Sequence, residues 1–131
     1  MQSGSGNKWK SKITESKGAA GLKPFSGKDD FKEWVTTLVN VFSVVHQDSR
    51  NFFKELIKKM NEVHKELSDI EVEEIMDDMN WQDSASIFEL LNEDLYYILI
   101  EKTTGQGLEK VQATTPGHGI VAFMKLFVWF G

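Results

Sequence analysis

The sequence predicts an all-α protein, a compact bundle of five to six helices with a basic, flexible N-terminal arm. Apolar residues recur at spacings of three and four from residue 31 to residue 130. Capping residues and glycines divide this pattern into segments of helical length. No segment shows a convincing alternation of apolar and polar residues, which would indicate a half-buried strand. We therefore expect a basic arm over residues 1–24 and a helical core over residues 25–131.

The arm is rich in Gly, Ser and Lys, and residues 1–28 contain six lysines but one glutamate. In contrast, seven acids lie between Glu66 and Asp78. A basic segment on an acidic body can bind RNA or dock on a neighbouring copy, and the sequence leaves both open. Trp9 and Ile13 are the apolar residues that would serve docking. The candidate RNA contacts are Lys8, Lys10, Lys12 and Lys17.

Two long helices follow the arm. Ser26 and Asp29 form a weak capping box for the first helix, and Asp48 or Ser49 can cap the second. The apolar stripe of the first helix contains Phe31, Trp34, Val35, Leu38, Phe42 and Val45. The stripe of the second contains Phe52, Leu56, Met60, Val63 and Leu67.

The second half of the chain is expected to form a short helix, a long helix and a final apolar helix. Ser68 and Glu71 have the spacing of a capping box and begin the short helix. The long helix starts near Ser84, and Gly105 and Gly107 are expected to end it. Residues 108–111 can form one or two further turns, and residues 120–130 form the final helix. The stripe of the long helix contains Ile87, Leu90, Leu91, Leu95, Ile98 and Leu99.

These stripes predict one contiguous core. We expect it to contain Phe31, Trp34, Leu38, Leu56, Ile87, Leu91, Leu95, Leu99, Phe123 and Leu126. Trp129 and Phe130 at the end of the final helix have no evident partner within the chain. Because an exposed apolar edge is typical of an assembling protein, they are candidate assembly contacts.

The sequence contains few groups that could carry chemistry. The absence of cysteine excludes disulfides, thiol nucleophiles and cysteine-based zinc sites. The three histidines share no metal-binding spacing, and no nucleophile elbow or phosphate-binding loop is present. Residues 78–89 approach a calcium loop, but Asp83 occupies the glycine position and the following residues are helical. We expect no enzyme activity, metal, cofactor or small-molecule substrate.

The chain has no apolar run of about 20 residues, the length that a membrane span requires. Its N-terminus lacks the apolar segment of a secretory signal. We expect a cytoplasmic protein without a membrane partner.

Three separated segments resemble the N-terminal domain of the Gag capsid of copia-type LTR retrotransposons. The turn at residues 24–27, which contains Phe25 and Gly27, together with Phe31 and Trp34, is similar to the family motif that opens the first helix. Leu95 and Tyr96 resemble its Leu-Tyr helix. The end of the domain is matched by Gly105, Leu108, Val111, Gly119, Ala122, Leu126, Trp129 and Phe130. One departure is the sequence Gly-Ile-Val-Ala-Phe at residues 119–123, where the family usually has Gly-Leu-Glu-Ala-Trp.

This resemblance spans about residues 16–130 and implies a structural, self-assembling protein. Its partners would be copies of itself in a virus-like shell in the cytoplasm, with RNA as a further expected partner through the arm. The alternative is a monomeric helical adaptor that binds a peptide or a partner helix in a groove between its helices. The dependence of particle size on protein concentration distinguishes the two functions.

Overall fold

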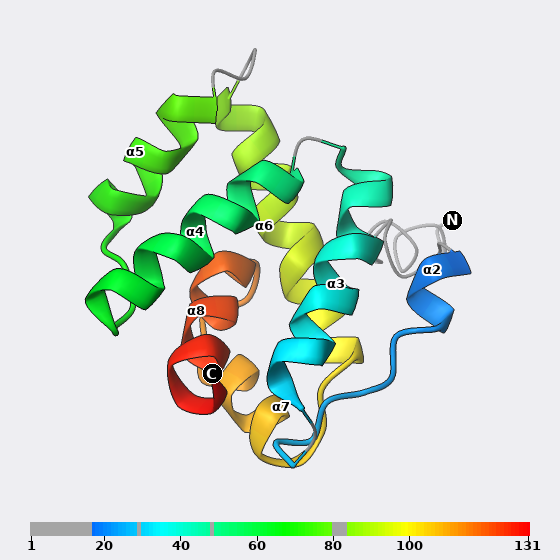
Figure 1. The fold of residues 1–131 in the computed structure, drawn as a ribbon. Coiled ribbons are helices and arrows are strands. Elements are labelled where there is room, and N and C mark those ends of the chain that lie inside the picture. Colours follow the sequence, from blue (N-terminus) through cyan, green and yellow to red (C-terminus); the bar gives the residue numbers. More distant parts are fainter. Residues whose placement is uncertain (1–16, 29, 48, 80–83) are drawn as a thin grey trace.

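The computed structural model describes residues 17–28, 30–47, 49–79 and 84–131, and these residues form an all-α bundle (Figure 1). A short helix α2 (Lys17–Ala20) precedes six longer ones. They are α3 (Phe31–Val45), α4 (Ser49–Val63), α5 (Asp69–Met79), α6 (Ser84–Glu101), α7 (Gly105–Gln112) and α8 (Gly119–Phe130). The prediction of a helical bundle is confirmed.

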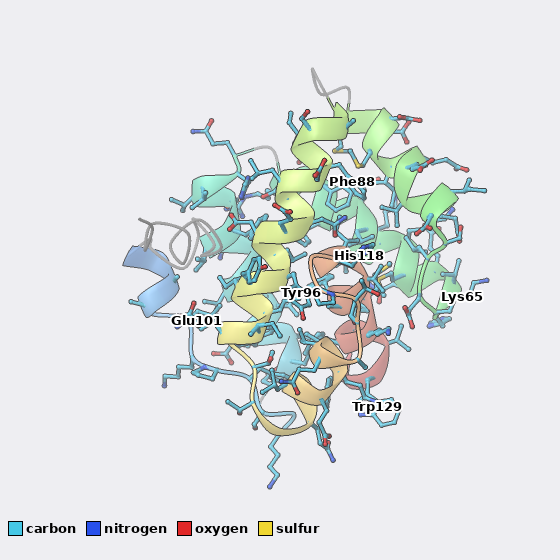
Figure 2. All side chains as sticks on the ribbon, turned by 180° about the vertical axis from the view of Figure 1, so that it is seen from behind. Lys65, Phe88, Tyr96, Glu101, His118 and Trp129 are labelled. Carbon is cyan, nitrogen blue, oxygen red and sulfur yellow. The ribbon has the colours of Figure 1, made fainter. Side chains whose placement is uncertain are left out.

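Helices that follow one another in the sequence also pack against one another. Helix α3 contacts α2 and α4, and α5 contacts α4 and α6. Helix α8 lies against both α6 and α7, which brings the end of the chain back onto its middle. Both views place α2 and α5 at opposite sides of the molecule (Figures 1 and 2).

One predicted cap is present, and one is replaced. Ser68 and Glu71 form the expected reciprocal capping box, in which Ser68 N–H donates to Glu71 Oε1 over 3.0 Å and Glu71 N–H donates to Ser68 Oγ over 3.2 Å. Ser49 is the first residue of α4, and its hydroxyl donates to the His46 carbonyl over 2.6 Å. This bond differs from that of an N-cap, whose side-chain oxygen accepts from an N–H of the first helical turn. Helix α3, however, is capped by Asp30, whose carboxylate accepts from Glu33 N–H over 3.2 Å.

The expected cap at Ser26 is wrong because α3 begins only at Phe31, so the residue before the helix is Asp30. Gly27 has a φ of 111°, which belongs to the left-handed region and cannot continue a right-handed helix. Asp29 and Asp48 lie outside the described residues.

The prediction that Gly105 and Gly107 end the long helix is also wrong. Helix α6 ends at Glu101, and both glycines belong to α7. Between the two helices, Thr103 is 2 % exposed and forms an isolated parallel bridge with Phe25. The pairing of Thr103 with Phe25 therefore ends α6 before the chain reaches Gly105.

The core agrees with the predicted stripes in nine of ten residues. Ile87 is the exception, because it is half-buried and lies outside the core cluster. Leu90, on the same predicted stripe, is 44 % exposed, whereas Phe88 packs against the core. The first turns of α6 are therefore covered less completely than their sequence predicts. None of the helices within the described ranges is long and apolar enough for a membrane span.

Candidate functional site

The opening turn motif forms an aromatic cluster with the end of the chain. The Phe25 ring is fully buried, and its centroid lies 5.3 Å from those of Phe31 and Trp34 and 5.0 Å from that of Phe130. The indole N–H of Trp34 donates to the Lys23 carbonyl over 2.8 Å, so the buried ring keeps a polar partner. Residues separated by about a hundred positions in sequence thus share one apolar cluster.

Backbone hydrogen bonds fix Phe25 against the segment between α6 and α7. Phe25 N–H donates to the Lys102 carbonyl, and Thr104 N–H donates to the Phe25 carbonyl, both over 2.8 Å. A Cβ on Gly107 would lie 3.1 Å from that same Phe25 carbonyl oxygen. The close approach explains why a residue without a side chain suits this position.

The motif glycines at 27 and 105 border the same cluster. Gly105 has a φ of 55°, and a Cβ there would lie 3.3 Å from the Ser26 carbonyl oxygen. A Cβ on Gly27 would lie 3.0 Å from the Phe130 ring. Both positions combine a left-handed backbone with little space, which favours glycine.

The remaining motif residues meet where α8 crosses α6. A Cβ on Gly119 would overlap the backbone nitrogen of Tyr96 and would lie 2.7 Å from Leu95 Cβ. Leu95 and Ala122 are fully buried, and Tyr96 is nearly so. The Leu-Tyr motif and the closing glycine motif therefore occupy one helix contact.

Asn92 completes this contact, and the sequence analysis missed it. Its side-chain Oδ1 accepts from Ile120 N–H over 2.8 Å, so it satisfies one of the free N–H groups at the start of α8. The sequence signal that could have identified it is the presence of polar Asn92 among the apolar residues of α6.

The expected tail contacts separate into two environments. The prediction that Phe130 lacks a partner within the chain is wrong, because its ring packs on Phe25 and Phe31. Trp129 is 62 % exposed, and Lys110 Nζ lies 3.5 Å from its ring centroid. Val128 is 48 % exposed beside it. We call Val128 and Trp129 the tail patch, and Figure 2 shows Trp129 at the surface.

A buried ion-pair geometry links α3 to α6. His46 Nε2 lies 2.6 Å from Asp94 Oδ2, and the His46 ring stacks on Phe42 with centroids 4.7 Å apart. The Asp94 side chain is 3 % exposed and that of His46 is 13 % exposed. This contact secures the end of α3, and no local sequence pattern indicates that the two residues pair.

A cavity of about 240 Å³ lies between α5, α6 and α8. Its apolar wall includes the buried residues Val72, Ile120 and Met124. Phe88 on α6 and His118, the residue before α8, also line it, and Figure 2 labels both. The other lining residues are Asp69, Glu73, Asn92 and Val121. A second hollow of about 280 Å³ lies beside Trp34, between the segment before α3 and α3 itself.

The charged groups near this cavity are mainly acidic. Asp69 and Glu73 of α5 line it and are exposed, whereas Glu74 and Asp78 line another hollow beside Lys58 and Lys59 of α4. Glu71, also on α5, has a pKa below its ordinary value. The main cause is the hydrogen bond from the Ser68 backbone N–H, and the hydrogen bond from the Ser68 hydroxyl is the second cause. Within the described ranges, no group of three His, Asp or Glu residues could hold a metal ion.

Several expected contacts fall outside what the structure describes. These are Trp9, Ile13, Lys8, Lys10 and Lys12, together with the side chain of Lys17. Residues 80–83 of the calcium-like segment 78–89 are also outside, and the final residues of that segment belong to α6 as predicted.

The chain was compared with protein-family models, with curated proteins and with solved structures, and none of these comparisons gives a match.

Proposed function

We propose that this chain is a self-assembling, capsid-like structural domain whose copies form a shell. One observation carries the proposal. Most of the residues that resemble the Gag capsid motifs, although scattered between residues 25 and 130, lie in the aromatic cluster or at the α6–α8 contact, and Trp129 is the exposed exception. Such positions have steric requirements that a chance match of short motifs would not be expected to meet.

The tail patch supports assembly as the role of this fold. An exposed Trp beside an exposed Val presents apolar surface that a neighbouring copy can bury. Trp is also among the residues that contribute most to protein interfaces. RNA is a further proposed partner, through the lysines of the arm, because the body exposes an acidic α5.

The experiment measures particle formation against protein concentration, by light scattering and electron microscopy. We expect particles from the parent protein and a roughly tenfold or larger rise in the required concentration for Trp129→Ser, since a hot-spot side chain contributes at least about 1.4 kcal/mol. Val44→Ser is the matched control, because Val44 is 72 % exposed on α3 and away from the tail. Its threshold should equal that of the parent.

The competing function is the monomeric adaptor, which the cavity between α5, α6 and α8 favours because it offers an apolar recess to a partner side chain. A parent protein that stays monomeric across the whole concentration range would support the adaptor and contradict the shell. Particles that form equally well with Trp129→Ser would remove the tail patch from the proposal but retain assembly.

A further inference from the structure

The cavity between α5, α6 and α8 has the size of a side-chain pocket. Its volume of about 240 Å³ is below the roughly 300–1,000 Å³ of pockets that hold drug-sized molecules. Val72, Ile120 and Met124 form a buried apolar wall, so one large apolar side chain suits it. A free small molecule would fit it less well.

The rim of this cavity selects for positive charge. Asp69 and Glu73 lie on the rim and are exposed, and neither forms an ion pair with any residue in the described part of the chain. Glu74 and Asp78 of α5 instead line a separate hollow that they share with Lys58 and Lys59 of α4, so Asp69 and Glu73 are the acids that face this cavity. The complementary ligand is therefore an aromatic side chain flanked by cations.

The chain itself contains such a segment. Residues 8–13 read Lys-Trp-Lys-Ser-Lys-Ile, with a lysine on each side of Trp9. Trp81 has uncharged neighbours, whereas Trp34 is buried and Trp129 lies against Lys110. Trp9 is thus the tryptophan whose sequence neighbours match the charge of the rim.

The position of α2 indicates which copy provides the arm. Helix α2, where the arm joins the body, packs on α3 and lies on the side of the molecule opposite α5 (Figures 1 and 2). Trp9 precedes Lys17 by eight residues, which span at most about 28 Å when extended. An arm that leaves this side would have to cross its own body to reach the cavity, whereas a neighbouring copy can present its cavity directly.

We propose that the cavity between α5, α6 and α8 receives Trp9 from the arm of a second copy, while Lys8 and Lys10 pair with Asp69 and Glu73. The inference rests on the proposed function, because it names a subunit contact of the assembled shell. It assigns the arm to subunit docking, one of the two roles that the sequence leaves open.

Because the chain lacks cysteine, introduced cysteines can test this contact without background. One protein carries Ser11→Cys in the arm, and a second carries His118→Cys at the rim of the cavity. His118 is exposed and makes no side-chain capping bond to α8. The matched control is Thr36→Cys, an exposed position on α3. Proteins are treated with nuclease, mixed in pairs and oxidised, and disulfide-linked dimers are separated on non-reducing gels.

We expect a mixture of the Ser11→Cys and His118→Cys proteins to form linked dimers at least about tenfold faster than a mixture of the Ser11→Cys and Thr36→Cys proteins. Adding Trp9→Ala to the arm, or Glu73→Gln to the rim, should slow linkage toward the control rate, and so should high salt. Equal rates for the two pairs would overturn the proposal. So would a chain carrying both cysteines that links only within itself.

Light scattering on the same proteins before oxidation separates this result from the proposed function. A parent that forms particles while the two pairs link at equal rates refutes arm docking and leaves shell assembly intact. Specific linkage without any particles supports arm docking and contradicts shell assembly.

Discussion

The two halves of α6 have similar apolar content but different surroundings. In the C-terminal half, Leu95, Ile98 and Leu99 are fully buried, and Leu91, next to the midpoint of the helix, is 1 % exposed. In the N-terminal half, Ile87 is half-buried and Leu90 is 44 % exposed. Helix periodicity places all six on one expected stripe, so the sequence pattern alone does not distinguish the halves.

The difference lies in the elements that cover each half. Gly119 lets the start of α8 approach the backbone of α6 at Asn92, Leu95 and Tyr96. The region around Phe88 instead borders the cavity shared with α5. An apolar stripe therefore becomes core only where a partner helix can approach closely, and the uncovered remainder is available for other contacts.

The largest expected effect compares one leucine from each half. Leu95→Ala should lower the free energy of unfolding by about 2–5 kcal/mol, because it leaves a cavity in a fully buried site. Leu90→Ala should change it by less than about 0.5 kcal/mol, since the side chain is already exposed. Urea denaturation followed by circular dichroism measures both. Equal losses would show that the N-terminal half is part of the core.

A smaller effect is expected from adding one methyl group at the crossing. Gly119→Ala should cost about 1–3 kcal/mol, because its Cβ would lie 2.5 Å from the Asn92 carbonyl oxygen and would overlap the Tyr96 backbone. Gln112→Ala, at an exposed position of α7, serves as the control for substitution in a neighbouring helix. Thermal denaturation of both variants tests this, and an unchanged Gly119→Ala protein would mean that α8 does not approach α6 this closely.

The smallest expected effect concerns α5, which borders the less covered half. The lowered pKa of Glu71 means that its ionised form stabilises the folded state. This contribution is fully present above the ordinary pKa, near 4.5, and is lost as the pH falls through the lower pKa of the folded state. Glu71→Gln should therefore be slightly less stable than the parent at pH 7, and the difference should shrink on acidification.

Urea denaturation at pH 7 and at pH 3 measures this change. Glu73→Gln is the matched control, because no described hydrogen bond joins Glu73 to a helix cap. A difference between Glu71→Gln and the parent that grows on acidification would contradict the assigned sign.

Much of the fold follows from the sequence because its determinants are local. The spacing of apolar residues gave the helices, and Ser68 with Glu71 formed the expected capping box because both residues lie within one turn. Nine of the ten predicted core residues are buried for the same reason, since each lies on the apolar face of its own helix.

What the sequence could not determine depends on contacts between distant segments. The end of α6 is decided by the pairing of Phe25 with Thr103, and the position of Phe130 by its packing on Phe25. The pairing of His46 with Asp94 likewise requires α3 and α6 to meet. Helical periodicity specifies which face of a helix is apolar, but the neighbour that covers that face is chosen by tertiary packing.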